Sequence, residues 1–289
     1  MKILVTGGKG MLGRTLVGEL AAPSREFIVA DLPEWDITDG DAFMQKALAA
    51  APDLIIHCAA MTNVDGCEAE RERAFAVNEG GTRNVAVAAK ACGARLIAIS
   101  TDYVFSGDSP REPWAWGEAD MPRPQTVYGA SKLAGERMAL MIHPDNTVIL
   151  RIAWLYGAGG PSFVHKMAEL GSAEGGPLKV VDDQRGNPTS AKAVAGVIDF
   201  LVSHPEVSGI VHGTCEGQCT WCELAKELFS LLERKGRRMR AIVPCTTAEF
   251  PRLAPRPRNS ALRKSVLNLL GYRTPDWRDA LAEFVEEEF

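Results

Sequence analysis

Tyr128 and Lys132 are a pair of residues that could transfer a proton. They stand four positions apart at the start of a predicted helix over residues 126–142, and this spacing puts both side chains on one helix face. An unperturbed tyrosine, with a pKa of about 10, is a weak acid at neutral pH, and a nearby ammonium group stabilises its phenolate form. Such a pair alone is common on helix surfaces, so its meaning depends on what lies beside it.

A second polar group is predicted beside this pair. The segment Ser100-Thr101-Asp102-Tyr103 ends a predicted strand, and ligands of open α/β sheets bind at the carboxyl ends of the strands. Thr101 is therefore expected to hydrogen-bond a carbonyl oxygen of a bound molecule.

A glycine-rich loop lies between the first predicted strand and the first predicted helix. It reads Thr6-Gly7-Gly8-Lys9-Gly10-Met11-Leu12-Gly13. Gly7 permits a tight turn, Gly10 lets the backbone approach a pyrophosphate, and Gly13 allows the helix to pack closely on the strand. Amide groups at the helix N-terminus attract the anion, so the loop predicts dinucleotide binding.

Asp31 ends the second predicted strand, 18 residues after Gly13. An acidic residue about 20 residues beyond the glycine motif binds the ribose hydroxyls of the adenosine, which favours NAD(H). Lys9 and Arg14 are near enough in sequence to attract the 2′-phosphate of NADP(H). The choice between NADH and NADPH stays open.

Short apolar runs alternate with longer amphipathic stretches over residues 1–155, which is typical of a parallel sheet with crossover helices. Strands are expected at 2–6, 27–30, 54–58, 95–100 and 147–152, and helices at 11–21, 40–50, 69–92 and 126–142. The fold class is α/β, a doubly wound Rossmann-type parallel sheet. Residues 156–289 are richer in glycine and proline and predict a smaller, mainly substrate-binding lobe, with returns to the sheet near 186–215.

Composition excludes several classes. A net charge of −5 gives no general attraction to nucleic acid, and the basic run between Arg234 and Arg240 is more typical of a solvated helix end. The absence of a long apolar run and of a signal peptide predicts a cytoplasmic protein with no membrane partner. Seven cysteines without a secretion signal indicate reduced thiols.

Cys215, Cys219 and Cys222 form a C-x₃-C-x₂-C cluster that could hold zinc together with His212 or Cys245. A capping box that starts at Thr220 explains the local sequence without a metal. We expect packing roles, although Cys222 in a first helical turn is expected to have a lowered pKa and to be easily alkylated. None of the histidines has metal-ligand spacing, and Trp114, Trp116 and Trp221 are expected to pack.

The chain resembles the extended short-chain dehydrogenases/reductases that act on nucleotide sugars. The motifs that carry this resemblance are Thr6-Gly7-x-x-Gly10-x-x-Gly13, Val77-Asn78-x-x-Gly81-Thr82-x-Asn84 and Tyr128-Gly129-x-Ser131-Lys132-Leu133-x-Gly135-Glu136. Within that superfamily it is most similar to the dTDP-4-dehydrorhamnose reductase family. Four further motifs carry this match: Ser100-Thr101-Asp102-Tyr103-Val104-Phe105, Arg151-x-x-Trp154-Leu155-Tyr156-Gly157, Asp183-Gln184-x-Gly186-x-Pro188-Thr189 and Arg256-Pro257-x-Asn259-Ser260-x-Leu262.

The resemblance implies a role for each matching residue. Tyr128 donates the proton, Lys132 holds the nicotinamide ribose and lowers the pKa of the tyrosine, and Thr101 orients the C4 carbonyl of the sugar. The substrate-binding residues are Thr101, Asp102, Trp154 and Arg256. The residues expected at the cofactor, NADH or NADPH, are Gly7, Gly10, Met11, Leu12, Gly13, Asp31, Asp36, Ile37, Ala59, Ala60, Tyr128 and Lys132.

The implied reaction is reduction of the C4 ketone of dTDP-4-dehydro-L-rhamnose to dTDP-L-rhamnose. Related 4,6-dehydratases follow the threonine with Asp-Glu, whereas Thr101-Asp102 is followed here by Tyr103. Two alternatives stay open: reduction of another nucleotide deoxysugar, or a non-catalytic regulatory subunit that resembles the β subunit of methionine adenosyltransferase.

Two departures from the family pattern affect finer expectations. Met61 stands after the paired alanines, where many members have histidine, and this leaves substrate contacts open. Some members pair through a metal held by acidic residues, but Thr15 and Lys192 occupy the regions where carboxylates are expected. We therefore predict no metal, and the oligomeric state stays open, with a homodimer as one possibility.

Overall fold

The computed structural model describes residues 1–108 and 115–289, so Trp114 lies outside the described residues. Its central sheet has six parallel strands in the order β10-β5-β4-β3-β1-β2. These strands are β1 (Lys2–Thr6), β2 (Glu26–Ala30), β3 (Leu54–His57), β4 (Arg95–Thr101), β5 (Thr147–Ile152) and β10 (Gly209–His212). The middle strands are almost wholly apolar because helices cover both faces of the sheet.

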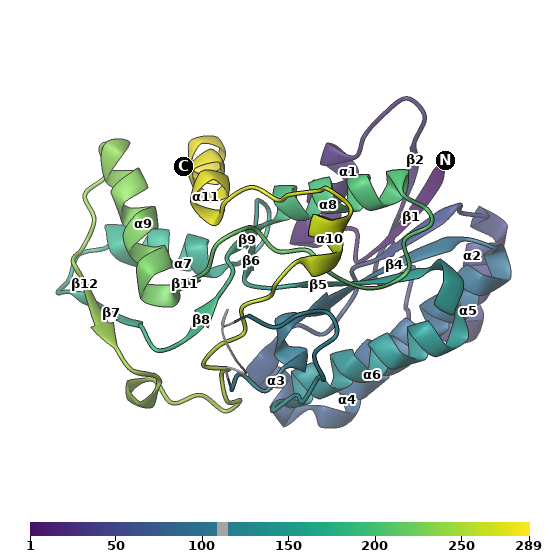
Figure 1. Cartoon of the computed structure of the whole chain (residues 1–289), viewed down its shortest axis with the longest axis horizontal. Helices are drawn as coiled ribbons and strands as arrows, with labels where there is room; N and C mark the ends of the chain where they lie inside the picture. The colour runs from purple at the N-terminus through teal and green to yellow at the C-terminus, as the bar shows by residue number, and fades with distance from the viewer. Residues whose placement is uncertain (109–114) are drawn as a thin grey trace.

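The helices lie in two layers, one on each face of the sheet (Figure 1). One layer contains α1 (Met11–Glu19) and α8 (Ala191–Ser203), whose apolar faces share one hydrophobic cluster with the sheet. The other contains α2 (Gly40–Ala50), α5 (Thr82–Cys92) and α6 (Val127–Ile142), which form a second cluster. This arrangement confirms the doubly wound α/β fold.

The predicted helix over 69–92 is wrong as a single element. It is divided into the end of α3 (Val64–Ala69), α4 (Arg71–Phe75), the π-helix η1 (Ala76–Gly81) and α5. The wider π turn brings the carbonyl of Asn78 against α6, where a Cβ on Gly135 would lie 2.3 Å from that oxygen. Periodicity alone does not reveal such a local widening of a helix.

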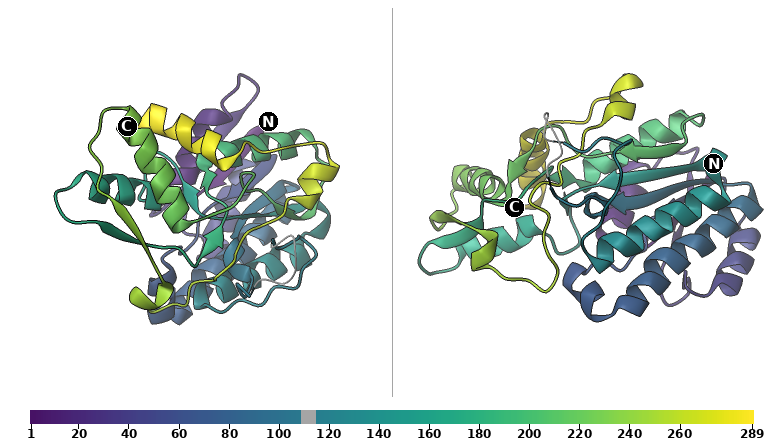
Figure 2. Two further views of the ribbon diagram at one scale, coloured as in Figure 1. Left: turned by 60° about the vertical axis from the view of Figure 1, so that its left-hand side comes forward. Right: turned by 60° about the horizontal axis from the view of Figure 1, so that its bottom comes forward.

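The second half of the chain gathers to one side of the sheet (Figure 2). Its main elements are α7 (Phe163–Ser172), β7 (Leu178–Val181), α9 (Trp221–Arg234), β12 (Ile242–Cys245) and α11 (Trp277–Glu288). Shorter elements lie among them: β6 (Leu155–Tyr156), β8 (Arg185–Gly186), β9 (Thr189–Ser190), β11 (Cys219–Thr220), the 3-10 turn η4 (Thr247–Glu249) and α10 (Ser265–Leu269). The 3-10 turns η2 (Asp102–Val104) and η3 (Pro144–Asn146) belong to the first half, after β4 and α6. This half has a hydrophobic cluster of its own, and α8 and β10 return to the sheet.

The cysteine cluster lies inside this second core. Cys215, Cys219 and Cys222 are at most 1% exposed and pack among apolar side chains. Burial raises the pKa of the Cys222 thiol, so the expectation of a lowered pKa was wrong. The helix N-terminus cannot offset the loss of hydration at this depth.

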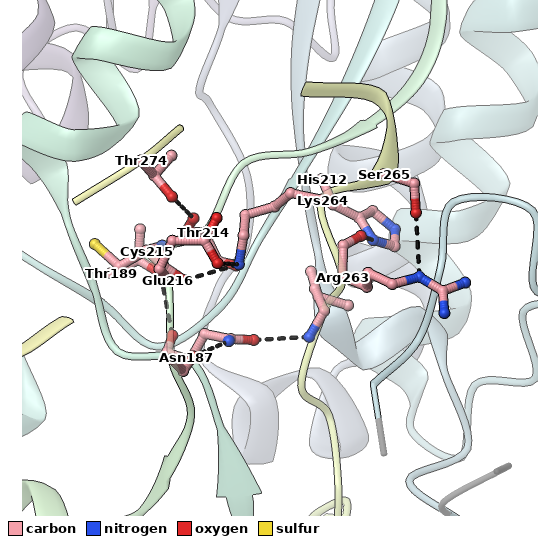
Figure 3. Close-up of polar contacts among 12 residues, drawn as sticks. Asn187, Thr189, His212, Thr214, Cys215, Glu216, Arg263, Lys264, Ser265 and Thr274 are labelled. Carbon is pink, nitrogen blue, oxygen red and sulfur yellow. Dashed lines mark hydrogen bonds and ion pairs between the residues drawn. The ribbon is translucent and has the colours of Figure 1, made fainter. Parts of the chain in front are cut away.

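A polar network ties together distant segments of the second half of the chain (Figure 3). Lys264 donates to the carbonyl of Cys215 at 3.1 Å and pairs with Glu216 at 3.2 Å. The side chain of Asn187 accepts a hydrogen bond from the amide of Leu262 at 2.7 Å. These bonds fix the segment around residue 260, which runs from the second half back to the site.

Candidate functional site

The glycine loop is closely packed at the carboxyl end of β1. Gly7 has a positive φ of 64°, and a Cβ there would lie 2.7 Å from the amide nitrogen of Ala59. A Cβ on Gly13 would lie 2.5 Å from the carbonyl of Gly7. Gly10 is the N-cap of α1 and has no side chain to bond the first amides, so these amides can bind a phosphate.

The remaining predicted cofactor residues divide into surface and core positions. Met11, Ala59 and Ala60 are partly exposed beside the loop, whereas Leu12 and Ile37 are at most 6% exposed and belong to the hydrophobic clusters. Exposed Asp36 holds Thr38 through two hydrogen bonds of 2.8 and 2.7 Å, which lower the pKa of its carboxyl group. Leu12 and Ile37 thus pack in the hydrophobic core of the first half of the chain.

Asp31 is attached to the glycine loop. One carboxylate oxygen accepts the amide of Lys9 at 2.8 Å, and the other accepts the amide of Leu32 at 2.8 Å. The side chain of Lys9 reaches the carbonyl of Leu32, whereas Arg14 lies next to Gly159. Of the two cations considered for a 2′-phosphate, Lys9 is therefore the one beside Asp31.

Tyr128 and Lys132 occupy the first two turns of α6 as predicted. Thr126 caps this helix by accepting the amide of Gly129 at 3.0 Å. A Cβ on Gly129 would lie 2.1 Å from the carbonyl of Tyr103, so the helix starts in close contact with η2. The rings of Tyr103 and Tyr128 meet edge to face at 5.6 Å.

The electrostatics of this pair are set mainly by burial. Burial raises the pKa of Tyr128, the hydroxyl of Thr101 lowers it, and the charge of Asp102 raises it further. Burial lowers the pKa of Lys132 to about 8, against the opposing charge of Glu136. Lys132 donates to the carbonyl of Ile99 at 2.8 Å, and the expected lowering of the tyrosine pKa by this lysine stays a prediction.

Thr101 and Asp102 lie at the carboxyl edge of β4, 5% and 2% exposed. The Thr101 hydroxyl donates to Asp102 at 3.0 Å and accepts the amide of Tyr103 at 3.2 Å. Burial raises the pKa of Asp102 to about 6, and the hydroxyls of Ser260 and Thr101 offset only part of that effect. Thr101, Asp102 and Tyr128 are thus brought together.

Asn78 is a residue of the site to which the sequence motifs assigned no role. Its carboxamide accepts the amide of Met61 at 2.8 Å and donates to the carbonyl of Met61 at 3.1 Å. It also donates to Ser131 at 3.0 Å, and the Ser131 hydroxyl bonds the carbonyl of Tyr128 at 2.9 Å. Asn78 therefore links the loop after β3 to the helix turn of Tyr128.

Trp154 packs against another aromatic ring, whereas Arg256 forms an ion pair. Trp154 has a positive φ of 46°, and its indole stacks on Trp221 from the second half of the chain. Arg256 pairs with Asp65 of α3 at 2.8 Å, and Asp65 also accepts the amide of Ala254 at 2.9 Å. Arg256 thus ties the second half of the chain to the first, with part of its charge already balanced.

A cleft mainly in the second half of the chain is lined by none of the three predicted catalytic side chains. It has a volume of about 680 Å³ and is lined by Gly107, Asp108, Asp182, Asp183, Arg185, Gln218, Thr220, Arg258 and Asn259. Its three carboxylates and two guanidinium groups give it mixed charge.

Lys192 lies where family members were expected to carry a carboxylate. Its ammonium pairs with Glu283 at 2.7 Å and with Glu287 at 2.8 Å. Across residues 1–108 and 115–289, no cluster of His, Cys, Asp and Glu is arranged to hold a metal. In the same ranges, no helix is long and apolar enough to cross a membrane.

A Rossmann-type sheet with a glycine-loop cradle, and with threonine, tyrosine and lysine at its carboxyl edge, defines a nicotinamide-dependent oxidoreductase of the extended short-chain dehydrogenase/reductase type. Comparison with known proteins agrees: the model of the RmlD substrate binding domain family matches residues 1–289. The chain belongs to this family.

Similar proteins carry related names. A dTDP-4-dehydrorhamnose reductase of Streptomyces griseus is 42% identical over 97% of this chain and 91% of its own. A protein of Streptomyces antibioticus, named a probable dTDP-4,6-dihydroxy-2-methyloxan-3-one 4-ketoreductase, is 40% identical over 98% of this chain and 94% of its own. The structure of a dTDP-4-dehydrorhamnose reductase from Bacillus anthracis in complex with NADP has a TM-score of 0.92 and 38% identity, with 99% of both chains covered.

Proposed function

We propose that this protein reduces the C4 ketone of dTDP-4-dehydro-L-rhamnose to dTDP-L-rhamnose, with NADH or NADPH as reductant. The observation that carries the proposal is the meeting of Thr101, Tyr128 and Lys132 at the carboxyl edge of β4, next to the glycine loop. The names of the relatives support the same reaction.

The loop residues fit a dinucleotide. Gly7, Gly10 and Gly13 leave no side chain between the first amides of α1 and an approaching pyrophosphate, and Asp31 keeps lone pairs for ribose hydroxyls. Ala59 and Ala60 would border the adenosine side, and Lys132 the nicotinamide ribose. When bound, the reduced nicotinamide supplies the hydride.

The protein's own residues handle the proton. A phenol with a raised pKa stays protonated throughout the neutral range, so Tyr128 can give its proton to the oxygen at C4 as negative charge develops there. Thr101 fixes that oxygen by a hydrogen bond. The ammonium of Lys132 then favours the phenolate that remains.

Three side chains are proposed to bind the substrate beyond C4. Asp102 lies next to Thr101 and contacts sugar hydroxyls, and Trp154 presents an edge of its indole to the sugar. Arg256 supplies a cation for the diphosphate, with Asp65 fixing its direction.

A related reductase activity is the second candidate. The Streptomyces antibioticus relative, 40% identical to this chain, is named for a different dTDP-sugar ketone. Both activities use the same proton donor, so they differ in the sugar ketone that the pocket accepts. A homodimer and a cytoplasmic location belong to the same proposal and are tested by sedimentation and by cell fractionation.

The direct test is to add dTDP-4-dehydro-L-rhamnose to the purified protein with NADH or NADPH and to follow the loss of nicotinamide absorbance. Oxidation of either cofactor with dTDP-L-rhamnose as product supports the proposal and ranks the cofactors. Oxidation only with another dTDP-4-keto sugar favours the second candidate. No oxidation with any of these ketones would overturn both.

A further inference from the structure

A buried ion pair lies behind Lys132, on the side away from Tyr128. Arg151 of β5 donates to both oxygens of Glu136 of α6, from Nε at 2.9 Å and from Nη2 at 2.6 Å. The hydroxyl of Ser100 donates to the same carboxylate at 2.5 Å. Arg151 is 0% exposed and Glu136 is 4% exposed, so neither charge is hydrated by bulk water.

The geometry shows that this carboxylate is fixed in place. Two parallel bonds from one guanidinium group define both its position and its plane, and the Arg151 guanidinium also lies 5.2 Å from the centre of the Phe105 ring. A buried pair of this kind contributes little net stability, because desolvation of both ions offsets their attraction. Its presence beside a catalytic helix therefore calls for another explanation.

Glu136 lies one helical turn after Lys132, on the same face of α6. A small cavity of about 10 Å³ is lined by both side chains together with Thr82 and Ser100. This is about the space of one water molecule, and its lining offers polar partners on several sides. Glu136 thus faces Lys132 across this small cavity. Its negative charge acts on the ammonium group although the two side chains form no direct ion pair.

Few other charges act on Lys132. The titratable groups that act on it are Glu136 of α6, His57 of β3 and Cys58, which follows β3. Tyr128 lies one helical turn before it on α6, and Arg151 of β5 is paired with Glu136. Burial lowers the pKa of His57 to about 3 and raises the pKa of Cys58 to about 12, so both are neutral at pH 7. Glu136 is the group whose negative charge most favours the ammonium form of Lys132.

We propose that Glu136 is a positioning residue for the reduction: its carboxylate, oriented by Arg151 and Ser100, keeps Lys132 in the ammonium form. The inference rests on the proposed function, in which the charged Lys132 holds the cofactor ribose and stabilises the phenolate of Tyr128. Without Glu136, Lys132 and Arg151 would be two buried cations that had lost the carboxylate between them.

The test is the pH profile of Glu136→Gln. The amide keeps the shape of the side chain and one acceptor oxygen but removes the charge. For the wild type, kcat is expected to fall above about pH 8, where Lys132 loses its proton. Removal of a negative charge lowers the pKa of Lys132, so the alkaline limb of the variant is expected to move down by about one pH unit. An alkaline limb at the wild-type pH would overturn the proposal.

Two further variants separate charge from structure. Glu136→Asp keeps the charge and is expected to restore a limb close to that of the wild type. Glu216→Gln removes the glutamate paired with the buried Lys264, away from the site, and is expected to lower stability and leave the limb unchanged. If Glu136→Gln does not fold, the double variant with Arg151→Met removes the unpaired guanidinium too, and a downward shift is still expected.

A binding measurement separates this inference from the proposed function. The affinity for NADH and for NADPH is measured by fluorescence titration between pH 6 and pH 10, without any sugar. The inference expects the alkaline loss of affinity to begin at lower pH in Glu136→Gln. If the wild type turns over no ketone but this shift occurs, the proposed function fails, whereas the control of the Lys132 charge by Glu136 in cofactor binding stands. Turnover without a shift in either profile overturns the inference alone.

Discussion

The indole of Trp221 lies on the indole of Trp154, with ring centroids 3.5 Å apart and planes 6° from parallel. A Cβ on Gly186 would lie 2.4 Å from Trp154 Cε2, so the glycine backbone packs directly against the indole. Trp154 has a positive φ, a conformation that costs a non-glycine residue about 1–2 kcal/mol. The stack and the close packing of Gly186 therefore hold Trp154 in a strained conformation.

Trp221→Ala is expected to raise the KM for the nucleotide sugar about three- to tenfold, because loss of the aromatic pair, worth about 0.5–1.5 kcal/mol, lets Trp154 leave its position. The kcat is expected to change less, since Trp221 does not touch the reacting atoms in this proposal. Steady-state kinetics at varied sugar concentration measure both values. Trp221→Phe keeps a stacking face and serves as the matched control; a wild-type KM for the alanine variant would contradict the role.

Local sequence patterns predict the strands, helices and glycine loop that carry this site. They do not predict the contacts between residues that are far apart in the chain. The strands and the glycine loop follow from apolar runs and from the spacing of Gly7, Gly10 and Gly13. The stack of Trp154 on Trp221, in contrast, joins residues far apart in the chain, and neither residue type nor spacing indicates it. Arg256 likewise was predicted as a substrate-binding residue, and its partner Asp65 became visible only in the folded chain.

The thiols are expected to react in two groups. Cys58 and Cys92 are partly exposed, whereas Cys67, Cys215, Cys219, Cys222 and Cys245 are buried. Burial raises the pKa of these thiols, which lowers the thiolate fraction available to a reagent. Burial also raises the pKa of Cys58 to about 12, so a disulfide reagent added to the native protein should label at most one thiol, Cys92, rapidly, and all seven in denaturant. Rapid labelling of Cys222, identified by peptide mass, would show that the second core opens readily.

Tyr128→Phe is expected to lower kcat by about a hundredfold or more, because the proton donor is lost while the ring still packs against Tyr103. The Kd for the nicotinamide cofactor is expected to stay within about threefold of the wild-type value. Stopped-flow reduction and fluorescence titration measure the two quantities. Tyr156→Phe removes a buried hydroxyl in the second core and is the matched control, with kcat unchanged. A kcat for Tyr128→Phe equal to that of the wild type would remove Tyr128 from the mechanism.

Asp102→Asn is expected to stabilise the protein, and more so at pH 8 than at pH 5. Burial raises the pKa of Asp102 from 3.8 to about 6. Between these values the folded state binds more protons than the unfolded state, so the stability of the wild type falls as the pH rises. A two-unit shift corresponds to a cost of about 3 kcal/mol that is fully present above pH 7, and roughly half of it is present at pH 5.

Urea unfolding at the two pH values measures this difference, and the gain from Asp102→Asn should be about 1–2 kcal/mol larger at pH 8. Asp36→Asn is the control. Hydrogen bonds from Thr38 lower the pKa of this exposed carboxyl group, so the charged Asp36 stabilises the wild type equally throughout pH 5–8 and stops doing so only in stronger acid. The effect of Asp36→Asn on stability should therefore be the same at pH 5 and pH 8. A gain from Asp102→Asn that is equal at both pH values would mean that Asp102 is hydrated in solution. Stabilisation with a loss of turnover would instead show that this buried carboxylate is kept for the substrate at the expense of folding, as expected for a residue next to Thr101 and Tyr128.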